Sequence, residues 1–357
     1  MDTTRLKEES KRAIGILRRC LSVRLATIHE ARLEAVFAAL DALLRGGRLS
    51  LTALGRAIGG AVAAKHSIKR IDRLLGNRHL HAEVTMWFAT IAEALARQIL
   101  PTNCRPIIET DAGYKNPWFK VVRKLGWHFV GRVPAGVLAI GADAAPATKR
   151  DREAWFRADS LHSRATTKPS DIGCHTLAKS NPLDVRLVLV MKHDKGRYGS
   201  KKVTRKGVHP GSTSYKKYQR RAREPGLLAT SLNHQTAKQI VALYSERMQI
   251  EETFRDTKNH RFGWSFEDAR SDNAQRLQVL FLLAALGILG LHLVGVAAER
   301  LNLHLRYQAN TIRTRRVLSF FVLGKMIVTT NTMEAITTER LEEAMEEVRR
   351  ALRGNGF

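Results

Sequence analysis

The sequence predicts a mixed α/β protein in which a strand-containing middle region lies between two helical regions. Three observations carry this prediction. Apolar residues recur at helical spacing through residues 1–100, short apolar runs of strand length follow between residues 106 and 230, and helical spacing returns from residue 236 onward. Strands mixed with flanking helices are typical of α/β and α+β domains.

The charge of the chain indicates its class of partner. The 357 residues include 60 Lys and Arg against 33 Asp and Glu, a formal net charge of +27. A hydrophobic fraction of 44% alongside 26% charged residues predicts a folded chain rather than a disordered one. Neutralising phosphates releases counterions and supplies affinity, so a folded protein this basic is expected to bind nucleic acid. An acidic small molecule would not require so large an excess of positive charge.

The cysteines and the N-terminus predict a cytoplasmic protein. Cys20, Cys104 and Cys174 are far apart and include no CxxC pair, which argues against both a disulfide framework and a zinc site. The first twenty residues carry acidic side chains and lack the apolar core of a signal peptide. We therefore expect a reduced, cytoplasmic environment.

One apolar segment raises the question of a membrane. Residues 279–298 contain only His292 as a polar side chain and are long enough for a transmembrane helix. The three glycines of this segment and the absence of a flanking aromatic belt favour a fully buried core helix. We expect a core helix and no membrane, with a membrane span as the alternative.

The first 82 residues predict a helical DNA-binding domain. Residues 1–47 have helical periodicity, and two short helices follow, with Ser50 as a candidate N-cap and Gly76 as a stop signal. Two short helices around a glycine-containing turn form a helix-turn-helix pattern. The second helix carries four basic residues expected to contact DNA, namely Lys65, Lys69, Arg70 and Arg73. A solvated basic face of a helical bundle is the alternative.

Short strands follow this region. After an amphipathic helix at residues 84–100, the run Pro106–Ile108 predicts a strand that ends at Glu109 and Asp111. Further strands are expected at residues 127–133, 137–140, 185–191 and 227–230.

A basic segment interrupts the strands. Residues 192–223 hold twelve Lys and Arg interleaved with Tyr198, Tyr215 and Tyr218. This pattern suits contact with phosphates and stacking on bases. A flexible basic loop without a site of its own is the alternative.

The helix expected at residues 236–260 carries the residues most suited to chemistry. Tyr244, Glu251 and Lys258 are spaced seven residues apart, two helical turns, and Arg247 lies one turn before Glu251. With this spacing, the Glu251 carboxylate could bind a divalent metal while the Tyr, Arg and Lys side chains on the same helix face bind a phosphate backbone. A charged surface helix with pairs such as Glu251–Arg255 is the alternative.

These residues also form a motif. The run Tyr-x2-Arg-x3-Glu-x6-Lys, within YSERMQIEETFRDTK, resembles the signature of the insertion-sequence DDE transposases of the IS four family. The block DAGYKNPWFKVVRKLGWHFVGRV resembles the segment around that family's second catalytic Asp, which corresponds to Asp111. The block KHSIKRIDRLLGNRHLH resembles its N-terminal DNA-binding region.

The resemblance implies an RNase H-like core and two-metal chemistry on phosphodiesters. By this resemblance Asp111 and Glu251 are catalytic ligands of Mg²⁺, with Mn²⁺ as a substitute. Tyr244, Arg247 and Lys258 then position DNA. The implied partners are double-stranded DNA, as terminal inverted repeats and target, and a second copy of the chain in a synaptic complex at the bacterial nucleoid.

The resemblance also predicts a division into functional regions. We expect a DNA-binding domain at residues 1–82, an RNase H-like core at residues 83–300 with a basic, β-rich insertion at about residues 142–232, and a C-terminal helical region at residues 301–357.

One departure from the family pattern bears on activity. The family places its first catalytic Asp on the first strand of the core, well before the second, yet no Asp lies between Asp72 and Asp111. We therefore predict an internal deletion that removes the first Asp and the first strands, with Glu109 as the nearest substitute. Two functions follow: a transposase that cuts and joins DNA, or an inactive DNA-binding derivative that inhibits an intact transposase.

Overall fold

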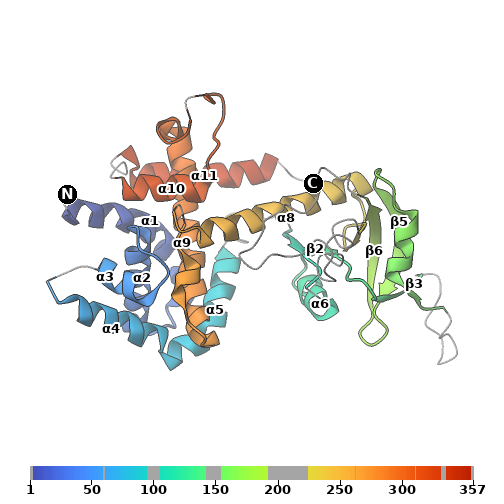
Figure 1. The fold of residues 1–357 in the computed structure, drawn as a ribbon, viewed down its shortest axis with the longest axis horizontal. Coiled ribbons are helices and arrows are strands. Elements are labelled where there is room, and N and C mark those ends of the chain that lie inside the picture. The colour runs from blue at the N-terminus through green and yellow to red at the C-terminus, as the bar shows by residue number, and fades with distance from the viewer. Residues whose placement is uncertain are drawn as a thin grey trace, which may run out of the picture. The chain divides into compact units, whose positions relative to one another are not determined.

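The computed structural model contains two compact units (Figure 1). It describes residues 3–58, 61–94, 105–113, 115–141, 154–191, 224–261, 263–309, 311–330 and 335–354. The helical unit combines residues 1–104 with residues 251–357, and the sheet unit comprises residues 105–250. The predicted mixed α/β class is confirmed.

The helical unit is built from both ends of the chain. Its N-terminal helices are α1 (Thr3–Leu25), α2 (Glu30–Leu44), α3 (Leu51–Ile58), α4 (Ala64–Leu75) and α5 (Arg78–Ala94). Its C-terminal elements are η3 (Phe266–Ala269), α9 (Ala274–Arg300), η4 (Leu303–Arg306), α10 (Phe320–Thr329) and α11 (Thr338–Gly354). The predicted helix-turn-helix pair is present as α3 and α4. Gly55 brings these two helices together, since a side chain there would overlap the backbone of Ile68.

Helix α9 forms the centre of the helical core. It is long and apolar enough to cross a membrane by length and composition, and 72% of its most apolar window is buried inside the protein. Helices α1, α2, α5, α10 and α11 all pack against it. The ring of Trp264 lies against Gly287 and contacts Phe321 edge to face. This burial supports the interpretation of α9 as a core helix.

The sheet unit contains seven strands. They are β1 (Ile107–Thr110), β2 (His128–Arg132), β3 (Leu138–Gly141), β4 (Phe156–Arg157), β5 (Ser170–Leu177), β6 (Leu183–Val190) and β7 (Gly226–Thr230). Their order in the sheet is β1-β2-β7-β6-β5-β3-β4. Strands β1 and β2 are parallel, and the remaining pairs are antiparallel. The five predicted strands are therefore confirmed, and β1 occupies one edge.

Successive side chains of each strand point to opposite faces of the sheet, so each face is covered by different helices. On one face Phe129 and Leu187 belong to a cluster that includes Phe119 of α6 (Asn116–Lys124) and Leu161 of the 3₁₀ helix η2 (Ala158–Arg164). On the other face Val130, Val188 and Leu228 pack with Ile240 of α8 (Ala237–Lys258).

The functional division predicted from the sequence remains a prediction, because the compact units follow packing rather than role. Residues 83–94 and 251–300 pack with the N-terminal helices in the helical unit. Within the predicted insertion, the described residues supply strands β4, β5, β6 and β7. Residues 142–153 and the basic segment 192–223 lie outside the described residues.

The crossing of α9 and α10 depends on glycine, which yields a stability prediction. A Cβ atom at Gly324 would overlap the backbone of Leu291, including its carbonyl oxygen. We expect Gly324→Ala to destabilise the protein by about 1–3 kcal/mol, as overpacking does, and to lower the melting temperature.

The matched control is Gly15→Ala on α1, where a Cβ meets nothing within 4 Å. Alanine is the better helix former by about 0.5–1 kcal/mol, so this variant should melt at the same temperature or higher. Equal melting of Gly324→Ala and the unmodified protein in calorimetry would contradict the packing argument.

Candidate active site and nucleic-acid interface

Asp111 lies at the carboxyl end of the parallel strand pair. Ile107 pairs with His128 and Thr110 with Gly131, so both strands run toward this end of the sheet. Asp111 follows β1 directly, is exposed, and accepts a hydrogen bond on Oδ1 from the backbone N–H of Gly113 at 2.8 Å. Ligands of open α/β sheets typically bind at the carboxyl ends of strands. The position of Asp111 is therefore suited to a reacting or binding role.

Glu109 lies two residues earlier on β1 and faces α8. Ile107 packs with the cluster under α8 and Ile108 with the opposite cluster, so strand alternation turns Glu109 toward α8. Burial, followed by repulsion from Glu246, raises the pKa of Glu109 to about 7, while Arg247 opposes the shift. This carboxyl group therefore gains and loses its proton near neutral pH, unlike an ordinary glutamate.

Tyr244 and Arg247 of α8 lie near the same strand end. The Cζ atom of Arg247 is 5.5 Å from the centroid of the Tyr244 ring, a cation–π arrangement. Burial raises the pKa of Tyr244, the charges of Arg247 and Arg132 oppose the shift, and Asp111 adds to it. Asp111, Tyr244 and Arg247 therefore lie close to one another near the end of β1, and the DNA-positioning role that the motif implies for the last two remains a prediction.

Glu251 and Lys258 lie further along α8, which is a single unbroken helix. Both side chains are exposed. Residues seven apart on a helix are separated by about 10 Å along its axis, so Tyr244, Glu251 and Lys258 follow one ridge. The division between compact units falls between Ile250 and Glu251. Asp111 therefore belongs to the sheet unit, whereas Glu251 belongs to the helical unit.

The carboxylates of the described residues do not form a complete metal centre. No group of three or more His, Cys, Asp or Glu side chains within the described part of the chain is arranged to hold a metal ion. In the sheet unit, Asp111 has Glu109 as its neighbour on the same strand, and the raised pKa of Glu109 works against its serving as an anionic ligand. The residues present in this unit therefore do not fit a two-metal site.

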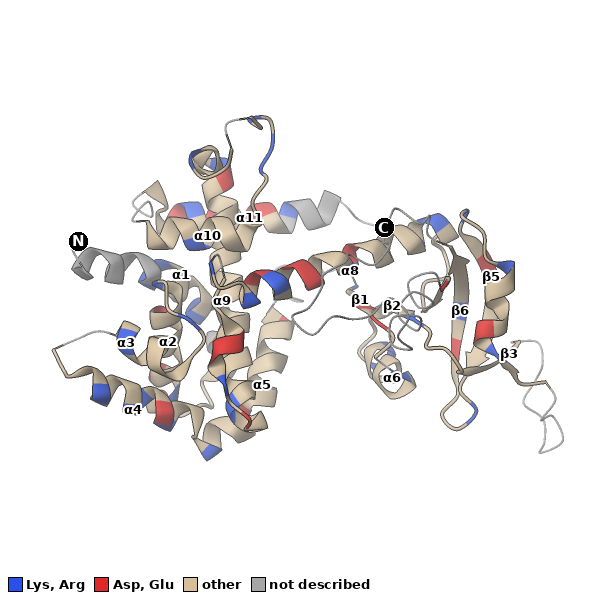
Figure 2. Ribbon diagram, in the orientation of Figure 1, with Lys and Arg blue, Asp and Glu red and all other residues tan. Residues whose placement is uncertain are grey.

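Helix α4 presents the basic residues predicted to contact DNA. Lys65, Lys69, Arg70 and Arg73 are all exposed, and Figure 2 shows basic segments along this helix. Lys69 donates to Asp72 at 3.2 Å, and Asp72 also accepts from Arg276 of α9 at 3.0 Å. Asp72 therefore ties α4 to α9, and its pKa is lowered chiefly by the hydrogen bond from Arg276.

Two residues at the end of β1 were missed from the sequence. Glu246 precedes Arg247 in the quoted motif, yet helical spacing gives no reason to place it beside Glu109. Arg132 ends β2, and its positive charge acts to lower the pKa of Tyr244. The parallel register of β1 and β2 provides this connection, and no signal in the sequence specifies that register.

The mixed sheet, with an aspartate at a strand end and a Tyr–Arg pair on the covering helix, is consistent with the expected RNase H-like class of nucleic-acid enzymes. A family model described as "Transposase DDE domain" matches residues 89–288. This span is more than half of the chain, and the protein therefore belongs to the transposase DDE domain family. No curated protein matches the chain.

Family membership establishes the coarse function. The protein is a transposase-type protein of DNA transposition and recombination, DNA is the partner of its class, and domains of this class generally use divalent metal ions. The matched span contains Asp111, Tyr244, Arg247, Glu251 and Lys258. It begins after α4, so the basic face of α4 lies outside the match.

Glu109 generates a prediction about pH and stability. Its pKa in the folded protein, about 7, exceeds its ordinary value of 4.5. Protonation therefore favours the folded state, and the resulting stability is fully present below the unfolded pKa and is lost as the pH rises through the folded pKa. Glu109→Gln, which stays neutral, should become progressively more stable than the unmodified protein between these two values, with a constant difference above them.

Denaturant midpoints measured across this pH range test the prediction. Glu246→Gln removes the repulsive neighbour, so the pKa of Glu109 should fall toward its ordinary value, and the loss of stability should be smaller and complete at a lower pH. The control is Glu252→Gln, an exposed residue of α8. A difference between Glu109→Gln and the unmodified protein that does not vary with pH would refute the assignment.

Proposed function

We propose that this protein binds the terminal inverted repeats of a bacterial insertion sequence of the IS four type without cutting them, and inhibits an intact transposase at those ends. The observation that carries the proposal is that the described residues of the sheet unit place no three-ligand group around Asp111. Family membership supports DNA as the partner. Such a protein would act in the bacterial cytoplasm, at the nucleoid.

The place of β1 in the sheet supports a deletion as the cause. Strand β1 pairs with β2 on one side and ends the sheet on the other, among the described strands. An edge strand that leads directly into Asp111 is the arrangement expected if preceding strands, with their own carboxylate, have been removed. The unpaired backbone groups of such an edge also favour pairing with another chain.

Inhibition requires only the binding functions. The exposed cations of α4 supply phosphate contacts, and Tyr244 and Arg247 supply a second contact near Asp111. A protein that occupies a transposon end, or joins an intact transposase in a mixed dimer, blocks synapsis without chemistry. A homodimer on paired ends is part of this proposal.

The second candidate is an active transposase, and one observation favours it. Glu109 and Asp111 lie two residues apart at the end of one strand, with Glu246 close to Glu109. In this alternative Glu109 replaces the missing aspartate, and Asp111, Glu109 and Glu251 are the ligands of Mg²⁺ or Mn²⁺. Lys258 then contacts DNA beyond Glu251.

The binding role of α4 can be measured from salt dependence. Replacing Lys65, Arg70 and Arg73 together by alanine should weaken binding to a duplex that carries the element's end. The slope of log affinity against log salt should fall by about 0.9 for each phosphate that the variant no longer neutralises.

The control is Arg350→Ala, which removes a cation from α11 beside Glu343 and Glu346. Unchanged affinity and slope in the triple variant would remove α4 from the DNA interface.

Cleavage separates the two candidate functions. The purified protein is incubated with a labelled end duplex and Mg²⁺ or Mn²⁺, and binding and nicking are read on the same samples. We expect a gel shift without strand cleavage for the unmodified protein. Addition of this protein to an intact transposase should reduce the cleavage of that enzyme.

Asp111→Ala, Glu251→Ala and Glu109→Gln are the matched variants. Cleavage by the unmodified protein that all three abolish would establish the active transposase and overturn the inhibitor proposal. Cleavage that persists in all three would point to a contaminating nuclease.

A further inference from the structure

A basic pocket lies at the end of the sheet opposite to Asp111. Its volume is about 360 Å³. It lies beside the start of β2, where His128 pairs with Ile107, and Arg105 precedes β1 by two residues. Asp111 follows the other end of β1, and a strand rises about 3.3 Å per residue, so the pocket and the candidate active site are separated by the length of the strand. All lining residues belong to the sheet unit.

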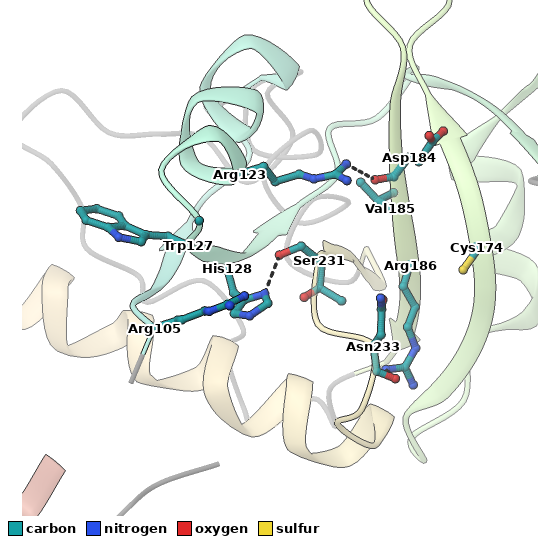
Figure 3. Close-up of a pocket in the computed structure, with 12 residues that line it drawn as sticks. Arg105, Arg123, Trp127, His128, Cys174, Asp184, Val185, Arg186, Ser231 and Asn233 are labelled. Carbon is teal, nitrogen blue, oxygen red and sulfur yellow. Dashed lines mark hydrogen bonds between the residues drawn. The ribbon is translucent and has the colours of Figure 1, made fainter. Parts of the chain in front are cut away.

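The side chains that line the pocket converge from α6, β2, β5, β6 and β7 and from their flanking loops (Figure 3). The Nδ1 atom of His128 is 3.3 Å from Ser231 Oγ, and Ser231 Oγ accepts from the backbone N–H of Phe129 at 3.1 Å. Burial, followed by the charge of Arg105, lowers the pKa of His128. The cation of Arg105 is therefore close to the imidazole, and the imidazole and the serine hydroxyl place hydrogen-bonding groups beside that cation.

Three arginines line the pocket, and one of them has a structural role. Arg186 donates to Asp171 at 2.5 and 2.9 Å and to the carbonyl oxygens of Leu232 and Gln235. It thereby fixes the loop between β7 and α8, including Asn233 at the rim. Arg186 is a positioning residue, and its charge is balanced by Asp171.

The other two arginines retain donors for a ligand. Arg123 of α6 is exposed and uses Nη1 to donate to the backbone oxygen of Asp184 at 3.2 Å, which leaves most of its five N–H donors available. Arg105 is exposed and forms no ion pair with a described carboxylate. The guanidinium group is suited to bidentate recognition of phosphate.

The acidic side chain in the lining does not neutralise these arginines. Asp184 is the acidic residue in the lining, and its Oδ1 accepts from Thr176 at 2.5 Å on the neighbouring strand. Figure 3 shows this carboxylate pointing away from Arg123. Helix α6, which carries Arg123, contains Lys120 and Lys124 and no acidic residue, so the basic surface continues along the helix from the rim.

We propose that the pocket formed by Arg105, Arg123, His128 and Ser231 binds a phosphate group of the DNA backbone, and that DNA contacts the sheet unit at this second point, away from Asp111. The open shape of the pocket and its continuity with the cations of α6 favour a phosphodiester over a small free anion. The inference rests on the proposed DNA-binding function and adds to it a site that the motif residues do not include.

The test compares two double variants of the 357-residue chain. Arg105→Ala with Arg123→Ala removes both available arginines of the pocket. Arg164→Ala with Lys168→Ala removes two exposed cations of the same unit outside it. Binding to an end duplex is measured over a salt series, and melting temperatures check folding. We expect the pocket variant to bind roughly tenfold more weakly, as for the removal of one charge-assisted hydrogen bond, and its salt slope to fall by about 0.9 for each phosphate that is no longer neutralised.

A second variant and a second ligand sharpen the outcome. Asn233→Asp adds a negative charge at the rim with almost no change of shape, and it should weaken DNA binding. Inorganic phosphate titrated by calorimetry distinguishes the source of the phosphate. Binding of inorganic phosphate that the pocket variant abolishes, with DNA binding unchanged, would overturn the proposal in favour of a small anion.

Three further outcomes keep this inference separate from the proposed function. Equal losses of affinity in the pocket variant and in the control variant would mean that only net charge matters, and would overturn the pocket alone. Loss of DNA binding in the α4 triple variant, with none in the pocket variant, would do the same. A failure of the unmodified protein to bind DNA would overturn both proposals.

Discussion

The burial of one side of α8 against the sheet is the interaction on which the candidate site depends. Ile240 is fully buried against Val130, Val188 and Leu228, and Tyr244 continues the same contact one turn later. Because a helix is rigid over a few turns, the burial of Ile240 fixes the position and rotation of Tyr244 and Arg247. Tyr244 and Arg247 therefore reach the end of β1, where Asp111 and Glu109 lie. The apolar contacts of Ile240, several residues earlier on α8, therefore set the positions of these two motif residues.

The same constraint explains why the carboxyl groups at the end of β1 differ. Asp111 lies beyond the last strand residue and is open to water, whereas Glu109 is held beneath α8 next to Glu246. A carboxyl group that is desolvated and faces a like charge retains its proton at higher pH. The two acids therefore have different surroundings: Asp111 is exposed to water, whereas Glu109 is a half-buried group that titrates near neutrality. A two-metal site needs several anionic ligands converging on one space.

Long periodic segments could be predicted from the sequence, and contacts between distant segments could not. The helices around α9 and the strands at β2, β3, β6 and β7 follow from apolar spacing, and Asp111 and the residues of α8 follow from a motif. Strand β5 has no such signal, because it lacks an apolar run and its polar residues, such as Asp171 and His175, do not alternate regularly with apolar ones. Its stability comes from pairing with β6. The proximity of Glu246 to Glu109, and of Arg105, Arg123 and Arg186 to one another, depends on register and strand order, which no local pattern encodes.

The positions of the basic residues and of the carboxylates explain how a protein of this kind can retain DNA binding after it has lost catalysis. In the proposed function, phosphate contacts come from separate surfaces, the exposed face of α4 and the cations along α6, and each would contribute on its own because long-range attraction to a polyanion is nearly additive. Catalysis by a metal centre is not additive, because an incomplete set of ligands neither holds nor orients the ions. Removing a strand beside β1 would therefore eliminate catalysis, which needs converging ligands, and would leave DNA binding, which is spread over separate surfaces. Selection on transposition activity would eliminate such a chain, whereas selection for restraint of an active element would retain it.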